Sequence, residues 1–267
     1  MEFVSLIGEG EDYVAGVWDE WLEDRAGFLA SAVLGGRVVG LSHLIDLGHG
    51  EWWLEGLRVD PRLHGQHIGS HLHEYQVDQW LATDGTVVRL VTHRERSAVH
   101  RMCAKTGFAR TATVSEFSFE AAGGGHRFQP AVLEEAERAV PRLLASPIQT
   151  ALGGLMDLGW RFARIEDDRI AAAAREGRLW TWGKGKGLLA ARFEEGSEGR
   201  TLAVSAIAPP ERDASAFLQD IPRLAGSLGV RSGRWLAPDA RLEPGDLVRA
   251  GYHPESTDPL WIFERRR

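Results

Sequence analysis

The chain has 267 residues, more than one typical domain needs, so its length favours two domains. Hydrophobic residues make up 43% and charged residues 26%, the values of an ordinary folded protein, and the net charge of −7 argues against a dedicated nucleic-acid binder. No apolar run is long enough to cross a membrane, and the acidic start does not resemble a signal peptide. The single cysteine, Cys103, excludes an internal disulfide and fits a reducing compartment, so we expect a cytoplasmic protein.

The first half of the chain, up to the linker described below, alternates strands and helices in the predicted order β-α-β-β-β-α-β-α-β. Hydrophobic periodicity predicts helices over residues 12–23, 68–81 and 97–105. Runs rich in β-branched and aromatic residues predict strands over 28–34, 37–45, 51–59, 86–92 and 114–120, with Gly35-Gly36 as a hairpin turn. This order predicts an α/β fold with a mixed sheet and helices packed on it.

Small residues at 121–126 predict a flexible linker between a domain at 1–122 and a second domain at 127–267. The charge divides unevenly at this point. Residues 1–122 carry 10 Lys+Arg against 18 Asp+Glu, and the rest of the chain carries 21 against 20. An acidic first domain favours a cationic substrate.

The second half repeats the order of elements more loosely. We expect helices over 131–144, 149–174, 214–228 and 246–249, and strands over 179–182, 188–193, 201–207, 233–237 and 260–264. The segments 104–108 (AKTGF) and 248–252 (VRAGY) both read as a helix end, a glycine, an aromatic residue and a strand. We interpret the second half as a diverged copy of the first.

The most informative segment is residues 52–72, WWLEGLRVDPRLHGQHIGSHL. A strand ends at Asp60-Pro61, a short loop follows, and a helix begins near Ile68. The free N–H groups and the dipole of a helix start attract anions, and glycines let a phosphate approach the backbone closely. Arg62 and His64 add positive charge, so the segment predicts a phosphate site, although its spacing fits neither the dinucleotide nor the Walker pattern.

This segment resembles motif A of the GNAT superfamily of acyl-CoA-dependent N-acyltransferases, whose loop reads Gln/Arg-x-x-Gly-x-Gly/Ala. The register here is His64-Gly65-Gln66-His67-Ile68-Gly69, with His64 in place of the usual Arg and His67 in place of a Gly or Ala. The segment 103–108 is similar to the family's Tyr-x-Lys-x-Gly-Phe ending, with Cys103 at the tyrosine position and Arg96 where the family has Asn. The resemblance covers residues 3–120, and residues 127–264 by element order only.

The resemblance implies two GNAT-like domains, each a twisted mixed sheet of six to seven strands flanked by helices. Acetyl-CoA would be the co-substrate and would lie between the strands predicted at 51–59 and 86–92. Its pantetheine arm would bond the backbone of Leu57, Arg58 and Val59. Its pyrophosphate would be held near Arg62 by backbone N–H groups of the loop and helix start, namely His64, Gly65, Gln66, His67, Ile68, Gly69 and Ser70. The second copy would be degenerate, since residues 208–213 carry no glycine at the helix start.

Three residues are candidates for proton transfer. Glu55 is the first choice for the general base, because on its strand it would share a face with Leu57 and reach the cleft, where burial raises a carboxyl pKa. The alternative for Glu55 is a solvated charge or an ion pair with Arg58. His93 is a second candidate base or a surface histidine, and Cys103 is a candidate acid or a small buried helix residue. His67 and His71 have a metal-ligand spacing, but no third ligand is evident, and we expect no metal.

These observations predict an N-acetyltransferase that transfers an acetyl group from acetyl-CoA to a primary amine of a small, cationic molecule by direct attack. We expect neither a nucleic-acid nor a membrane partner. The alternative is a non-catalytic module that binds coenzyme A or a protein partner and retains the fold.

Overall fold

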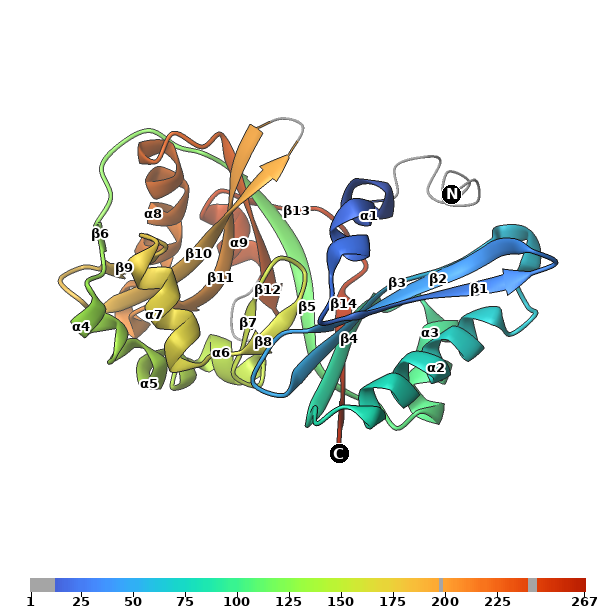
Figure 1. Ribbon diagram of the computed structural model, residues 1–267. Coiled ribbons are helices and arrows are strands. Elements are labelled where there is room, and N and C mark those ends of the chain that lie inside the picture. Colours follow the sequence, from blue (N-terminus) through green and yellow to red (C-terminus); the bar gives the residue numbers. More distant parts are fainter. Residues whose placement is uncertain (1–12, 197–198, 240–243) are drawn as a thin grey trace. The chain divides into compact units, whose positions relative to one another are not determined.

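The computed structural model describes residues 13–196, 199–239 and 244–267, which form two compact units (Figure 1). Unit 1 contains residues up to Thr92, Arg96–Arg110 and the last five residues, Phe263–Arg267. Unit 2 contains His93–Glu95 and Thr111–Ile262. The expected mixed α/β fold is confirmed, and no helix among the described residues is both long and apolar enough to span a membrane.

The sheet of unit 1 has the strand order β1-β2-β3-β4, continued by the end of β14. β1 and β2 form the predicted hairpin, since Gly35 and Gly36 have φ of 58° and 77° and Leu34 pairs with Arg37. β3 is antiparallel to β2 and parallel to β4. The bounds are β1 (Phe28–Leu34), β2 (Arg37–Asp46), β3 (Glu51–Val59), β4 (Val87–His93) and β14 (Leu260–Arg266). The first strand of the expected order falls before residue 13, outside the described residues.

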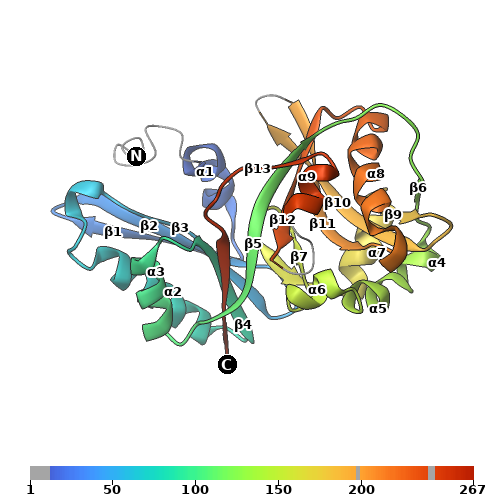
Figure 2. The same ribbon diagram turned by 180° about the vertical axis from the view of Figure 1, so that it is seen from behind.

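Helices cover both faces of this sheet. In Figures 1 and 2, α1 (Val14–Glu23) lies on one side of β1–β3, and α2 (Ile68–Ala82) and α3 (Ser97–Lys105) lie on the other. α1 buries Val14 and Trp21 in a cluster with Leu41 of β2. On the opposite face, Gln76 of α2 donates to the carbonyl oxygens of Phe28 and Ser42, at 2.8 and 2.9 Å.

The boundary between the units differs from the domain boundary expected near residue 122. In β5 (Ala109–Glu120), residues Val114 to Glu120 pair with β12 (Ser232–Pro238) of unit 2, while Phe263–Arg267 belong to unit 1. The segment expected to be a flexible linker also packs on unit 2. Its first two residues, Ala121 and Ala122, donate backbone hydrogen bonds of 2.8 and 2.9 Å to Arg231 and Pro222.

Unit 2 has the strand order β5-β12-β11-β10-β9-β6, with β13 beside β5 and a separate β7–β8 hairpin. Its remaining strands are β6 (Phe128–Pro130), β7 (Leu155–Asp157), β8 (Phe162–Arg164), β9 (Leu179–Trp182), β10 (Gly187–Gly196), β11 (Gly199–Ala208) and β13 (Tyr252–Pro254). Its helices are α4 (Leu133–Ala136), α5 (Ala139–Leu144), α6 (Pro147–Ala151), α7 (Asp167–Arg175), α8 (Ala214–Ser227) and α9 (Pro244–Arg249).

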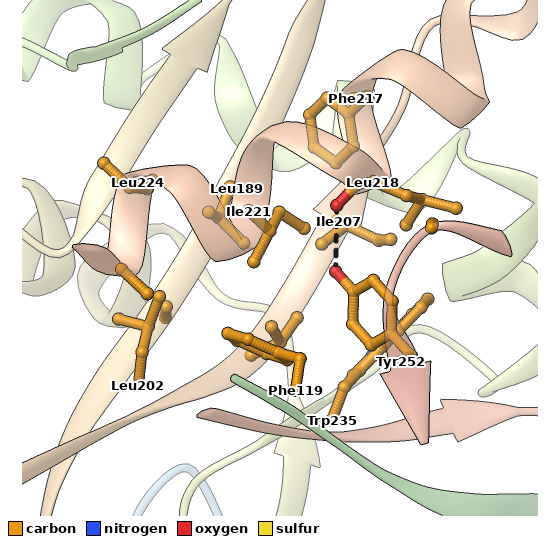
Figure 3. Packing of buried hydrophobic residues seen from close by; sticks show 14 of the residues in the cluster. Phe119, Leu189, Leu202, Ile207, Phe217, Leu218, Ile221, Leu224, Trp235 and Tyr252 are labelled. Carbon is orange, nitrogen blue, oxygen red and sulfur yellow. Dashed lines mark hydrogen bonds between the residues drawn. The ribbon is translucent and has the colours of Figure 1, made fainter. Parts of the chain in front are cut away.

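The core of unit 2 has two halves because successive residues of β10 and β11 point to opposite faces. On one face Phe217, Ile221 and Leu224 of α8 pack on Leu189 and neighbouring residues (Figure 3). The hydroxyl of Tyr252 donates to the carbonyl oxygen of Leu218 at 3.2 Å there, and burial raises its pKa. On the other face, Leu188 and Ala190 pack with residues of α4, α5 and α7.

The prediction of a single helix over residues 149–174 is wrong. Gly153 and Gly154 have φ of 66° and 75°, which ends α6, and the β7–β8 hairpin separates α6 from α7. The helix expected over 131–144 is likewise divided into α4 and α5.

Unit 1 contains a buried histidine that makes its stability depend on pH. His73 of α2 lies 2.8 Å from the hydroxyl of Thr106 and against the ring of Phe108. Burial, with the nearby charge of Arg265, lowers the pKa of His73 to about 4. The unfolded chain therefore binds a proton at this residue before the folded one does, and stability is lost as pH falls from about 6.5 towards 4.

We expect the free energy of unfolding to fall by about 2 kcal/mol between pH 7 and pH 5 through this group. His73→Gln, which can keep the bond to Thr106 without titrating, should remove that part of the pH dependence in urea unfolding. His71→Gln, on the same helix but exposed, is the control and should retain it. Equal pH dependence in both variants would contradict the assignment.

Candidate functional site

A bulge in β3 lies at the centre of the candidate site. Leu41 pairs with Arg58 and His43 pairs with Glu55, so two residues of β3, Gly56 and Leu57, oppose one residue of β2. Gly56 has a φ of 65°, and a Cβ there would stand 2.1 Å from the indole of Trp21. Only glycine fits this position, because the backbone is left-handed and a ring covers it.

Beyond the bulge, β3 parts from β4. The described ladder between these parallel strands runs from Glu51–Val87 to Trp53–Arg89 and goes no further. Leu57, Arg58 and Val59 therefore lie on a stretch of β3 that pairs with β2 on one edge only. On this stretch the side chains of Arg58 and His64 contact the carbonyl oxygens of Leu57 and Val59, at 3.1 and 3.3 Å. An extended ligand that displaces these side chains can bond the backbone in the manner of an added strand.

A rigid turn leads from β3 to α2. Asp60 accepts a hydrogen bond from the backbone N–H of Arg62, at 3.0 Å, and binds its guanidinium by Nε at 2.9 Å and by NH2 at 2.7 Å. These bonds hold the pKa of Asp60 at about 2. Arg62, expected to supply free positive charge, is thus engaged by Asp60. His64 follows the short turn at Pro61–Leu63 and lies with Nε2 3.3 Å from the carbonyl oxygen of Val59.

The amino end of α2 is open. Gly65 has a φ of 83° and His67, at the N-cap, a φ of 62°, so the chain turns through two left-handed residues before the helix. His67 makes no side-chain cap and its side chain is exposed, and no acidic residue occupies the first turn. The N–H groups of Ile68, Gly69 and Ser70 have no partner within the helix, since the first turn provides none. Together with the helix dipole they form an anion site.

A cavity of about 530 Å³ lies beside this loop. Residues of β1 form one wall, and Gln66, Ile68, His71 and Tyr75 form the opposite wall. The cavity thus adjoins the open end of α2 in unit 1.

Glu55 lies directly across from His43, a residue that the sequence pattern did not single out. Residues opposite each other in an antiparallel pair share a face, so Glu55 points to the face that α1 covers, with Arg58 and not with Leu57 as expected. His43 is buried, its ring lies 5.0 Å from that of Trp21, and its Nε2 lies 3.1 Å from Oδ2 of Asp24. The structure therefore brings a carboxylate, an imidazole and a second carboxylate close to the bulge.

The two other candidates for proton transfer have different surroundings. His93 clusters with unit 2, where its Nδ1 lies 3.4 Å from Oδ2 of Asp258, and half of its side chain is exposed. Cys103 is fully buried in unit 1, and burial raises the pKa of its thiol to about 12. A buried thiol of this kind favours the alternative reading, a small core residue of α3.

A buried charge cluster lies where β3 and β4 part. Arg89, the last residue of β4 in the ladder, is fully buried and binds Glu51 of β3 and Glu264 of β14, the latter by Nε at 2.7 Å. Burial works against the charge of Glu264, but Arg89 overcomes it, so the pKa of Glu264 is lowered. The NH2 group of Arg89 has no hydrogen-bond partner among the described residues.

No group of three or more His, Cys, Asp or Glu side chains is arranged to hold a metal ion in the part of the chain that the structure describes. His67 and His71 thus lack a third ligand there. What the site offers is an open strand edge, a set of helix amides and a carboxylate.

Comparison with known proteins agrees with this geometry. Residues 3–108 match the model of the acetyltransferase (GNAT) family. A comparison with curated proteins found no match.

Three solved structures share the fold over most of the chain. A GCN5-related N-acetyltransferase from Sphaerobacter thermophilus is 13% identical, with a TM-score of 0.65 over 99% of this chain and 90% of the other. An acetyltransferase of the GNAT family from Colwellia psychrerythraea is 14% identical, with a TM-score of 0.52 over 94% and 90%. A tandem GNAT protein from the clavulanic acid biosynthesis pathway is 14% identical, with a TM-score of 0.52 over 91% and 84%.

Proposed function

We propose that the chain belongs to the GNAT superfamily, whose family model matches residues 3–108, and that unit 1 is an acetyl-CoA-dependent N-acetyltransferase. The acceptor is the primary amine of a small, cationic molecule. One observation carries this proposal: the first-turn amides of α2 follow a short turn that begins at the end of β3, the strand whose ladder with β4 has already stopped at Trp53.

The residues of unit 1 fit the co-substrate along its length. The edge of β3 at Leu57, Arg58 and Val59 that is not paired with β2 bonds the amide groups of the pantetheine arm. The backbone N–H groups of Ile68, Gly69 and Ser70 hold the pyrophosphate, and Arg62, oriented by its ion pair with Asp60, lies at the rim. The turn before α8 in unit 2 differs, because Glu211 and Asp213 occupy it and would repel an anion.

The chemistry needs positioning of the reactants, removal of one proton from the amine and protonation of the leaving thiolate. The amine nitrogen attacks the thioester carbonyl, the carbon–sulfur bond breaks as the amide forms, and the thiolate takes a proton from water. A backbone N–H at the bulge polarises the carbonyl, and Glu55 accepts the proton of the amine directly or through water. The acidic composition of residues 1–122 favours a cationic acceptor.

A non-catalytic role is the second candidate. His67 stands where the family has a small residue, and the thiol of Cys103 is buried where the family has a tyrosine. Such a chain would bind coenzyme A and release no thiol.

Incubation with acetyl-CoA and a panel of small amines, followed by thiol release, tests the proposal. We expect release with cationic amines and a rise in melting temperature with coenzyme A. A rise without release would favour the non-catalytic role, and the absence of both would overturn both candidates.

The helix amides give a separate prediction. Ser70→Glu places a negative charge at the third position of α2, where it favours the helix dipole but repels a pyrophosphate. We expect coenzyme A to bind at least tenfold more weakly by calorimetry, with an unchanged melting temperature for the free protein. Ser70→Gln, of the same size and uncharged, is the control and should lose far less. Equal affinities of the two variants would place the pyrophosphate elsewhere.

A further inference from the structure

Unit 2 contains a small, partly open cavity lined by residues of α7, β10 and β11. Its volume is about 150 Å³, a size that in other proteins accommodates a benzene ring. Met156, Leu158 and alanines of α7 and β10 form apolar walls. Three arginines, Arg169, Arg178 and Arg192, and Ser205 provide the polar lining.

Ser205 supplies a hydroxyl that no described residue of unit 2 bonds. It lies in a bulge of β11, where the register shifts between Ala190 and Ala191 of the neighbouring strand. Only 4% of the residue is exposed, and its hydroxyl has no hydrogen-bond partner among the described residues. A buried hydroxyl without a partner is unfavourable unless a ligand or water bonds it.

Arg192 supplies a positive charge to the cavity, and the two acids near it are bound by another arginine. Its guanidinium lies against Gly159, where a Cβ would stand 2.6 Å from NH1, and no hydrogen bond or ion pair to a described residue engages it. The nearest acids, Asp157 and Glu194, are bound by Arg234 at 2.8 and 2.5 Å. Burial lowers the pKa of Arg192, so an anion beside it would be favourable.

The two other arginines are held at the cavity wall. Arg178 binds Glu176 by Nε at 2.8 Å, and Arg169 donates to the carbonyl oxygen of Arg164 at 2.8 Å. Both thus line the cavity from fixed positions and add positive potential to it.

We propose that this cavity binds a small carboxylate with a short apolar body, its oxygens on Arg192 and Ser205 and its body against Met156 and Leu158. A guanidinium matches the planar fork of a carboxylate. A dianion such as phosphate is disfavoured, because Asp157 and Glu194 lie close to Arg192 and the walls are apolar. This site is independent of the proposed coenzyme A site, since all of its residues belong to unit 2.

Calorimetric titration of the full chain with benzoate, benzamide and inorganic phosphate tests the proposal. Benzoate should bind with millimolar affinity or tighter, and its neutral isostere benzamide and phosphate should bind at least tenfold more weakly. Equal binding of benzoate and benzamide would show that the cavity binds the apolar ring without recognising the carboxylate, and would overturn the proposal. Stronger binding of phosphate, or no binding of benzoate, would equally overturn the proposal.

Variants test the contributions of Arg192 and Ser205 to benzoate binding. Arg192→Gln should weaken benzoate at least tenfold and Ser205→Ala about threefold, while Arg249→Gln, a change on the exposed surface of the same unit, should have no effect. Ser205→Ala should also leave the melting temperature unchanged or raise it, since the hydroxyl has no partner to lose. A lowered melting temperature of the Ser205→Ala variant would contradict the assignment. Unchanged benzoate affinity of the Arg192→Gln variant would contradict it as well. The circular dichroism spectrum of the full chain should be the same in all three variants and shows that they fold.

Discussion

Replacing Arg89 by methionine is expected to destabilise unit 1 by about 3–5 kcal/mol, the largest stability effect we predict for a single residue. The side chain is fully buried between Glu51 and Glu264, of which the first is 2% and the second 9% exposed. Methionine fills much of the same volume but removes the buried counter-charge that Glu51 and Glu264 share, although Glu264 keeps its bond to Arg266 at 2.6 Å. The two carboxylates must then take up a proton or admit water, and both lower the stability of the folded state.

Urea unfolding at pH 7, followed by tryptophan fluorescence, measures this effect. Arg101→Met is the matched control, because Arg101 is an exposed residue of α3 whose described contact is a long 3.4 Å bond to Ser97. It should change the free energy of unfolding by less than about 0.5 kcal/mol. An Arg89→Met protein within about 1 kcal/mol of the wild type would show that the cluster does not stabilise unit 1.

The local elements of unit 1 were predictable because their signals are local. The helices at Val14–Glu23 and Ser97–Lys105 follow hydrophobic periodicity, and the hairpin follows from Gly35-Gly36. The return of the chain end to unit 1 was not predictable. Glu264 lies 175 residues from Arg89, and no sequence pattern links two charged residues at that separation.

The candidate site likewise has one part that the sequence could predict and one part that it could not. The loop from His64 to Ser70 is one continuous segment, so its glycines and helix start could be recognised from the sequence. The surroundings of Glu55 depend on strand register, and the bulge at Gly56 shifts that register by one residue. Simple alternation therefore places Leu57 beside Glu55, and it misses His43 and Asp24 because their approach requires the pairing of β2 with β3 and the packing of α1.

Glu55→Gln is expected to reduce kcat for acetyl transfer by about 10²–10⁴-fold, the contribution of a positioned general base. The amide keeps the size and the hydrogen-bonding reach of the carboxylate but cannot accept a proton from the attacking amine. Coenzyme A affinity should be unchanged, because the backbone of Leu57–Val59 and the amides of α2, not this side chain, hold the co-substrate in the proposed site. The measurement is thiol release with the best amine of the panel, alongside calorimetric binding of coenzyme A.

Glu74→Gln is the control for Glu55→Gln, because Glu74 is an exposed carboxylate of α2 in the same unit. It should leave both turnover and binding at the wild-type level.

The two readouts then separate the roles of Glu55. Loss of turnover with intact binding supports the base. Loss of both, with a lower melting temperature, makes Glu55 a structural partner of the strand pair that also contains His43. Unchanged turnover would mean that water, and not Glu55, accepts the proton of the amine. The acidic side chains near the bulge would then serve only to attract the amine.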